Sequence, residues 1–227
     1  MSVESGTLSR TEVRAMFDGI APMYDLMNHA MTAGLHRRWR RLAARAVVWP
    51  GEQVLDACCG TGDFALAARA EGAIVTGVDF SERMLERARR KAQDIEWVLG
   101  DMLELPFENA TFDAATVGFG VRNVEDLGRG MRELRRVVRP GGRLALLEVV
   151  RPMGALAPFY GVWFDRLIPL AGKALPGGAA FTYLPASVRR FPVPAQLRAE
   201  VQAAGFSTVE SRLLSGGIVV LLVGEAA

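Results

Sequence analysis

The sequence predicts a three-layer α/β fold, with helices on both faces of a seven-stranded, mostly parallel sheet that ends in an antiparallel C-terminal hairpin. Three observations predict it. Continuous apolar runs, which suit parallel strands covered on both faces, alternate with helical stretches between residues 53 and 149. The glycine-bearing turn Gly60-Thr61-Gly62 joins the first run to a helix, as in the first unit of a doubly wound domain. Two more apolar runs, 206–213 and 218–223, are joined across Ser215-Gly216-Gly217 and predict the hairpin.

Residues 1–50 are expected to form a helical cap ahead of the sheet. Val13, Met16 and Phe17 fall on one side of a helix over 11–19, and Pro22 breaks that pattern. A second helix is expected over 34–48 and ends before Pro50-Gly51.

Residues 51–150 carry the alternation and are expected to form the cofactor-binding core. Gly72 ends the first helix of this core, and Pro140-Gly141-Gly142 ends the last. The expected strands are 53–57, 74–78, 95–99, 112–117 and 143–149, and the expected helices are 63–71, 82–91 and 124–138.

The alternation pauses over residues 151–191, which are rich in aromatic side chains. We interpret this stretch as a mostly helical insertion over the carboxyl edge of the sheet, on the substrate side. Residues 192–227 then supply a closing helix over 194–204, with Pro194 in its first turn, and the hairpin. We interpret 1–227 as a single domain, because this length suffices for one sizeable core.

The composition argues against several classes of protein. Half of the 227 residues are hydrophobic and 23% are charged, which is typical of a globular chain. A net charge of +2 gives no electrostatic case for nucleic acid. The basic cluster over 36–41 indicates a solvated helix face, with contact to an anionic membrane surface as the alternative. No transmembrane helix is visible in the sequence.

The cysteines and histidines indicate a reduced environment and no metal. Cys58 and Cys59 are adjacent, and disulfide geometry disfavours a bond between neighbours. Because no secretory signal heads the chain, we expect a cytoplasmic protein. With only His29 and His36, and no C-x-x-C, no metal site is expected.

The glycine turn predicts a nucleoside site, and its charges favour S-adenosylmethionine. Gly60, Gly62 and Ala65 also match the dinucleotide pattern G-x-G-x-x-G/A. A pyrophosphate would lie at the helix N-terminus, where the carboxylates of Asp56 and Asp63 would repel it. S-adenosylmethionine carries a sulfonium and an ammonium and no phosphate. The alternative for Asp63 is an acid favoured only by the helix dipole.

Two further acids end successive strands. Asp79, 17 residues after Gly62, is positioned to accept hydrogen bonds from two ribose hydroxyls; a solvated strand-end acid is the alternative. Asp101 is positioned to accept a hydrogen bond from the adenine amino group, and Met102 is positioned to pack on the ring. The alternative for Met102 is a side chain that packs in the core. Acids at 56, 79 and 101 together indicate a cationic nucleoside.

Arg122 and Asn123 follow the fourth strand, where the methyl group and its acceptor should meet. The functional interpretation is that they hold a substrate oxygen or a water. The alternative is that Arg122 pairs with a nearby acid such as Glu125.

Several separated stretches resemble the ubiquinone/menaquinone C-methyltransferase family, whose members methylate demethylmenaquinol and the related polyprenyl benzoquinol. The resemblance covers about Leu8 to Gly224. The matching stretches are FDGIAPMYDLMNHAMTAGLHRRWR (17–40), VLDACCGTGD (54–63), LPFENATFD (105–113), FGVRNV (119–124), RPGGRLALLEVVRP (139–152), YLPASVRRFP from Tyr183 and AGF ending at Phe206.

The resemblance implies a Rossmann-like class I methyltransferase fold and C-methylation of a polyprenyl quinol with S-adenosylmethionine. It implies that the cofactor contacts Thr61, Asp79, Asp101, Met102 and Gly118, and that Arg122, Asn123 and Tyr24 lie on the substrate side. The glycine turn itself adds Asp56, Gly60 and Gly62 to the expected cofactor contacts. The sequence departs from the family's pattern at Ala186, at Leu221-Leu222 and over 176–180. These departures concern the substrate side, so another lipid-like or small aromatic acceptor, including 2-polyprenyl-6-methoxybenzoquinol, stays open.

Methylation at a ring carbon needs electron density from a ring oxygen, above all as a phenolate. We expect Arg122 to stabilise the phenolate or polarise a water, with Asn123 and Tyr24 orienting it. His29 and His36 are weaker candidates for the base. An apolar route for the tail is expected along Met23, Met27, Trp39, Phe159, Tyr160, Trp163 and Phe164, although each of these is equally explained as cap core.

The expected partners are thus a polyprenyl quinol and, as open options, the inner face of a membrane and a second copy of the chain. Two other functions compete with the methyltransferase. A nicotinamide-dependent reductase would share the glycine turn, but Asp63 and the closing hairpin oppose it. A non-catalytic S-adenosylmethionine or quinone sensor would show a degraded motif at 119–123, whereas that motif is intact.

Overall fold

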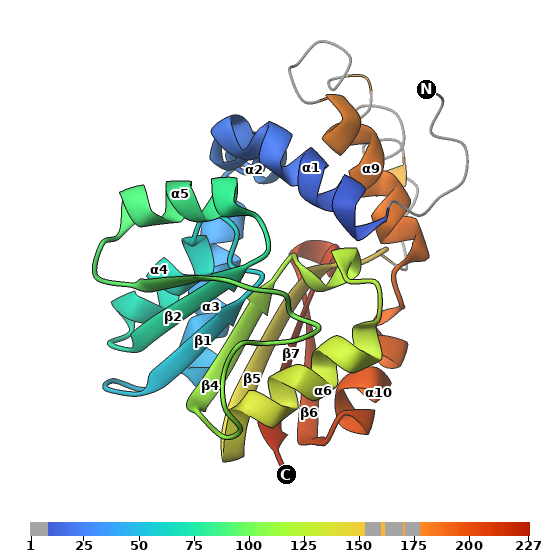
Figure 1. Cartoon of the computed structure of the whole chain (residues 1–227). Coiled ribbons are helices and arrows are strands. Elements are labelled where there is room, and N and C mark those ends of the chain that lie inside the picture. Colours follow the sequence, from blue (N-terminus) through green and yellow to red (C-terminus); the bar gives the residue numbers. More distant parts are fainter. Residues whose placement is uncertain (1–8, 153–159, 162–169, 171–177) are drawn as a thin grey trace.

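The computed structural model describes residues 9–152, 160–161, 170 and 178–227, and its core is one seven-stranded sheet (Figure 1). The strand order is β3-β2-β1-β4-β5-β7-β6. All pairs are parallel except those of β7, which runs antiparallel to both β5 and β6. The predicted fold class, with its C-terminal hairpin, is confirmed. The strands are β1 (Gln53–Ala57), β2 (Ile74–Asp79), β3 (Glu96–Leu99), β4 (Phe112–Gly118), β5 (Val138–Val149), β6 (Phe206–Leu214) and β7 (Val219–Ala226).

Apolar side chains from alternate positions of the strands fill two cores, one on each face of the sheet. Leu55 and Ala115 belong to one core, and their neighbours Val54 and Ala114 belong to the other, as the two-residue period of a strand requires. Helices α6 (Leu127–Val137) and α10 (Pro194–Ala203) cover the first face, and α3 (Leu35–Val47) and α4 (Asp63–Ala70) cover the second (Figure 1).

The first N-terminal helices, α1 and α2, form a cap that lies with α9 over one end of the sheet (Figure 1). The predicted cap also included the helix over 34–48, but this helix, α3, covers a face of the sheet instead. Ser81, the N-cap of α5, accepts a hydrogen bond from the Met84 backbone and donates one to Asp18 of α1 at 2.5 Å. The cap consists of α1 (Arg10–Ile20), η1 (Ala21–Met23) and α2 (Tyr24–Thr32). The helices that contact it here are α5 (Glu82–Lys91) and α9 (Gly178–Arg190).

The cap contains one helix, α2, that was not expected from the sequence. Pro22 does end α1, but a short 3-10 turn at Ala21–Met23 lets the chain restart at once as α2. The apolar residues Met23, Tyr24 and Met27 belong to this turn and helix.

Two elements begin at residues clearly different from those predicted. β5 begins at Val138 rather than Arg143, because Val138 pairs with Phe112 before the register shifts. α6 begins at Leu127, where Asp126 caps it by accepting a hydrogen bond from the Arg129 backbone, and Val121–Asn123 forms the separate turn η2.

Within the predicted insertion over 151–191, the structure describes α9, whose Leu184 and Val188 pack against the cap. Phe159, Trp163 and Phe164 lie outside the described residues. Leu221 and Leu222 are buried on opposite faces of β7, one in each core.

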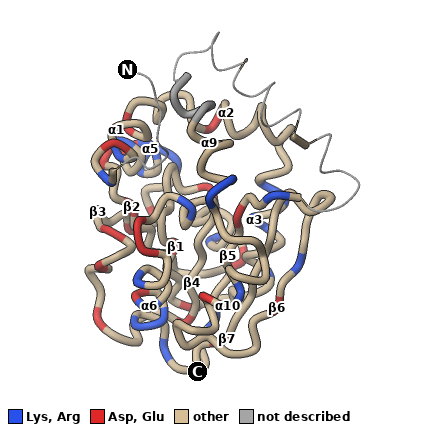
Figure 2. Tube along the Cα trace, turned by 90° about the vertical axis from the view of Figure 1, so that its right-hand side faces the viewer, with Lys and Arg blue, Asp and Glu red and all other residues tan. Residues whose placement is uncertain are grey.

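Charged residues are mixed along the elements in the view of Figure 2. No helix in the described ranges is long and apolar enough to cross a bilayer.

Candidate functional site

A cleft at the carboxyl ends of β1, β2 and β4 collects most of the predicted site residues. These strands end side by side, so the residues that follow them meet at one edge of the sheet. The predicted residues that line the cleft are Tyr24, Gly60, Asp79, Asp101, Met102, Gly118 and Asn123.

Asp79 offers a buried carboxylate at the end of β2. It accepts hydrogen bonds from the backbone N–H groups of Gly60 at 2.8 Å and Ser81 at 2.9 Å. Burial raises the pKa of Asp79 to about 6. Each carboxylate oxygen retains a further lone pair, so the group has acceptor capacity for two hydroxyls of a bound molecule.

Asp101 follows β3, the strand next to β2, and contacts the start of helix α1. Its Oδ1 accepts a hydrogen bond from the Leu103 backbone at 2.9 Å, and its Oδ2 pairs with Arg10 at 2.6 Å. The Arg10 backbone donates to Glu125 at 2.9 Å. Arg10 thus ties the start of α1 across this end of the cleft, a contact that sequence reasoning missed.

Asp56 is 0% exposed and lies behind the cleft rather than in its lining. Its carboxylate accepts hydrogen bonds from the Ala65 backbone and the Thr116 hydroxyl, both at 2.9 Å. Burial raises the pKa of Asp56 to about 7. Asp56 therefore holds β1, α4 and β4 together.

Thr61 and Gly62 lie beside the cleft and do not line it. The Thr61 hydroxyl donates to Asp25 at 2.5 Å and accepts from Lys91 at 3.0 Å. Gly62 is the N-cap of α4 with φ +85°, and a Cβ there would lie 2.5 Å from the Trp97 ring. Gly62 is needed for this turn and its packing.

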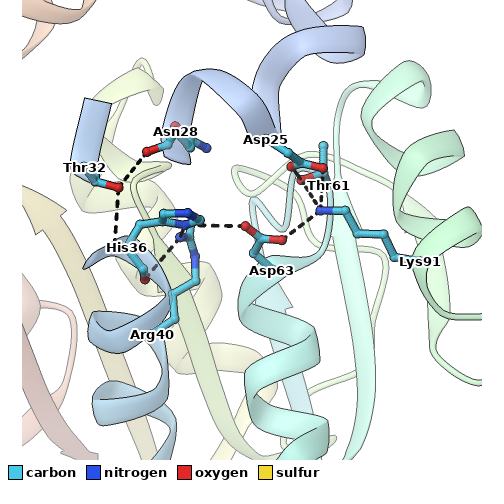
Figure 3. A network of polar contacts seen from close by, with 8 residues as sticks. All are labelled: Asp25, Asn28, Thr32, His36, Arg40, Thr61, Asp63 and Lys91. Carbon is cyan, nitrogen blue, oxygen red and sulfur yellow. Dashed lines mark hydrogen bonds and ion pairs between the residues drawn. The ribbon is translucent and has the colours of Figure 1, made fainter. Parts of the chain in front are cut away.

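Asp63 at the start of α4 is already paired with a cation. Lys91 pairs with Asp63 at 2.8 Å and with Asp25 at 2.8 Å, so the charge of Asp63 is already compensated (Figure 3). Asp63 therefore does not discriminate between a pyrophosphate and a sulfonium. The acids that line the cleft are Asp79, Asp101 and Glu125.

A second cavity of about 350 Å³ adjoins the cleft under the cap. Phe17, Tyr24 and Phe119 line both spaces, so the two meet at these aromatic rings. The cavity is mostly apolar, which suits a hydrophobic ligand. Met27, Trp39 and Tyr160, all predicted along the tail route, line it, whereas Met23 packs in the cap core.

Arg122 lines this cavity, but its partner differs from the acid suggested by the sequence. Its guanidinium donates to Glu148 at 2.6 Å and to the Phe119 carbonyl at 2.6 Å. Burial alone would lower the pKa of Arg122, but the Glu148 carboxylate, together with Tyr24 and Tyr183, more than offsets this effect and the pKa is raised. Glu148 is fully buried. An acid inside the apolar run LALLEVV was the sequence signal for this partner.

Polar atoms without partners cluster around the two spaces. Within the described residues, five buried side-chain nitrogens or oxygens have no hydrogen-bond partner: Asn28 Nδ2, His36 Nε2, Arg87 Nε, Arg122 Nε and Asn123 Oδ1. All but Arg87 belong to residues that line the cleft or the cavity. Because a buried unsatisfied group is costly, these atoms are suited to a ligand that supplies their partners.

His36 belongs to a polar network between the cap and the core (Figure 3). Its Nδ1 lies 2.7 Å from Arg40 Nη1 and 3.6 Å from Asp63. Burial and then Arg40 lower the pKa of His36 to about 4, so the ring is neutral. His29, the other candidate base, is exposed and lines neither space.

The donor set fits a nucleoside such as that of S-adenosylmethionine. Asp79 and Asn123 supply acceptors for hydroxyl and amino donors. Gly118 lines the same cleft, and a Cβ there would lie 2.7 Å from the Phe64 ring, so glycine is needed for this packing. The Cys58 thiol in the same cleft has a pKa raised by burial, so it is neutral. Across the described ranges, no three His, Cys, Asp or Glu side chains are placed to hold a metal ion.

Comparison with known proteins gives a consistent result. The family model described as the ubiE/COQ5 methyltransferase family matches residues 6–225. A demethylmenaquinone methyltransferase from Thermus thermophilus is 44% identical over 219 residues, covering 92% of this chain and 99% of that protein. A 2-phytyl-1,4-naphtoquinone methyltransferase from Synechococcus elongatus is 41% identical over 230 residues, covering 96% of this chain and 99% of that protein.

Among solved structures, the crystal structure of the [4+2]-cyclase SpnF has a TM-score of 0.73 at 19% identity and covers 100% of this chain and 99% of its own. At this identity the likeness concerns the fold alone.

Removing the Arg122 side chain should destabilise the protein. Arg122→Ala leaves Glu148 as a buried charge without its partner, and we expect the free energy of unfolding to fall by about 3 kcal/mol. Urea unfolding measures the loss. The double variant Arg122→Ala/Glu148→Gln, which removes the unpaired charge, should recover most of the loss, and an equal loss in both variants would refute this account.

Proposed function

The chain belongs to the ubiE/COQ5 methyltransferase family, and we propose that it methylates a ring carbon of demethylmenaquinol to form menaquinol. It is a methyltransferase whose methyl donor is S-adenosylmethionine. The observation that carries the choice of acceptor is the mostly apolar cavity that meets the nucleoside cleft at Phe17, Tyr24 and Phe119. A methyl donor in the cleft would lie against a hydrophobic acceptor in the cavity.

The names of the relatives support a naphthoquinone ring. The names of both relatives above refer to a naphthoquinone, and the name of the Synechococcus elongatus protein also specifies a phytyl tail. The alternative acceptor is 2-polyprenyl-6-methoxybenzoquinol or another lipid-like ring. We further propose that residues 1–227 act as one methyltransferase domain.

We assign the cofactor contacts to the residues that line the cleft. Asp79 accepts hydrogen bonds from the two ribose hydroxyls, and Asp101 accepts one from the adenine amino group. Met102 packs on the adenine ring. Gly60 and Gly118 allow close approach of the backbone. Asp56, Thr61 and Gly62 support this surface from behind.

S-adenosylmethionine supplies an electrophilic methyl group on its sulfonium. Arg122, with its raised pKa, is not a base; its Nε–H donates to a ring oxygen and its charge favours the phenolate. Tyr24, at the junction of both spaces, and Asn123 orient the ring. Alignment of this kind supplies on the order of 7–11 kcal/mol of the barrier reduction.

A single conservative substitution tests this function. The wild-type protein, given S-adenosylmethionine and demethylmenaquinol, should form a product heavier by one methylene, detected by mass spectrometry. Arg122→Lys keeps a cation beside Glu148 but removes the Nε donor, so kcat should fall by about 100-fold. Its affinity for S-adenosylhomocysteine should stay within threefold. No product from the wild type would refute the function, and an unchanged kcat would refute the role of Arg122.

The affinity for S-adenosylhomocysteine should depend on pH through Asp79. Only the ionised carboxylate accepts both ribose hydroxyls, and the pKa of Asp79 is about 6. The dissociation constant should therefore rise about tenfold between pH 8 and pH 5. Calorimetry across this range measures it. Asp79→Asn should bind weakly at both pH values with little pH dependence, and a flat wild-type profile would contradict the assignment.

We also propose that the turn between α2 and α3 contacts an anionic membrane surface while the lipid substrate enters. Leu35 lines the cavity and is 39% exposed, and Leu26 is 66% exposed. The neighbouring side chains of Arg38 and Arg41 on α3 are exposed. Basic and apolar side chains together are typical of such contacts.

Charge reversal at this surface tests the membrane contact. Arg38→Glu/Arg41→Glu should lose most binding to vesicles with anionic lipids in a sedimentation assay, because each basic residue near the surface contributes about 1 kcal/mol. The matched control Arg198→Glu/Arg212→Glu makes the same change of net charge on α10 and β6. Equal binding by both double variants would overturn the proposal.

A further inference from the structure

The cavity wall formed by α2 and α3 carries polar atoms to which the proposed roles of Arg122 and Tyr24 assign no partner. Asn28 on α2 and His36 on α3 line the mostly apolar cavity (Figure 3). Asn28 Nδ2 and His36 Nε2 are both buried, and neither has a partner among the residues that the structure describes. The two atoms are consequently not hydrogen-bonded to each other.

The proton of His36 can be assigned from its neighbours. Arg40 lies 2.7 Å from Nδ1 and can only donate, since a guanidinium has no acceptor. Asp63, at 3.6 Å from the same nitrogen, is too far to accept a hydrogen bond from it. Nδ1 is therefore an acceptor, and in the neutral ring the proton is on Nε2. This arrangement corrects the expectation of His36 as a base: its free nitrogen is a donor.

The network behind His36 holds this arrangement in place. Arg40 is 5% exposed, also donates to the His36 carbonyl at 3.4 Å and lies over the Phe119 ring at 4.9 Å. The Thr32 hydroxyl donates to the Asn28 backbone carbonyl at 2.6 Å and lies 3.5 Å from the His36 backbone nitrogen. Thr32 therefore connects the backbones of the two donor residues.

We propose that Asn28 and His36 form a donor pair for one oxygen of an aromatic acceptor, separate from the oxygen held by Arg122. This inference rests on the proposed function and deepens it. A quinol or quinone has two ring oxygens, and the cavity has two sets of unpartnered donors, at Arg122 and at the Asn28–His36 pair. Two donors to one oxygen favour a carbonyl or phenolate over a neutral hydroxyl. The acceptor class is therefore a ring with two oxygens and an apolar substituent.

Binding of matched ligands to matched variants tests the donor pair without turnover. The probes are a 1,4-naphthoquinone with one prenyl group and 2-prenylnaphthalene, which has the same carbon frame without the oxygens. Quenching of tryptophan emission reports binding, since Trp39 lines the cavity. His36→Asn keeps an acceptor for Arg40, but its amide stops short of the Nε2 position. His36→Gln places an amide N–H near that position. His29→Gln is the control at the exposed neighbouring histidine.

We expect His36→Asn to bind the quinone about tenfold more weakly than the wild type, as the loss of one buried hydrogen bond implies. Its affinity for 2-prenylnaphthalene should stay within twofold. His36→Gln should recover part of the quinone affinity, Asn28→Leu should resemble His36→Asn, and His29→Gln should resemble the wild type. S-adenosylhomocysteine should bind all four variants equally.

Two results would overturn the donor pair: unchanged quinone affinity in His36→Asn, or an equal loss for the quinone and the hydrocarbon, which would indicate a structural role. Failure of the proposed function is a different result. If the wild type binds the quinone more tightly than His36→Asn does but does not methylate demethylmenaquinol, the donor pair stands and the proposed reaction is wrong.

Discussion

The buried carboxylate of Asp56 is the interaction on which the cleft depends. It joins the end of β1 to Thr116 in β4 and to the first turn of α4. Burial raises the pKa of Asp56 to about 7, because the folded protein disfavours the charged carboxylate. The hydrogen bonds of Asp56 nevertheless hold the three elements together. In this arrangement the Gly60 N–H donates to Asp79 at the base of the cleft.

The cap is attached to this base by polar contacts rather than by apolar packing alone. Lys91 connects Asp25 of the cap with Asp63 of α4, and Ser81 connects α5 with Asp18 of α1. Directional contacts of this kind set the angle at which α1 and α2 cross the sheet edge. Tyr24 thereby reaches the junction between the nucleoside cleft and the apolar cavity.

Polar atoms without protein partners are concentrated at the cleft and the cavity. Asp56, Thr61, Asp63 and Glu148 have protein partners. Asn28, His36, Arg122 and Asn123 each have a buried atom with no partner in the described part of the chain, and all four line the two spaces. A folded protein keeps such atoms where a ligand compensates them. This pattern is the physical link between the fold and methyl transfer to an oxygenated ring.

The sequence alone determined the strands, the closing hairpin and the carboxyl-edge location of Asp79, Asp101 and Met102. These features follow from local periodicity and from the rule that ligands bind where parallel strands end, both of which are visible in a linear chain. The tertiary structure decided which polar groups face a ligand. Glu148 is 26 residues from Arg122, and Asp25 is 36 residues from Thr61, so no local pattern identifies these pairs. Asp56 and Asp79 look equivalent as strand-end acids, and only packing against α4 and β4 buries the first and leaves the second at the cleft.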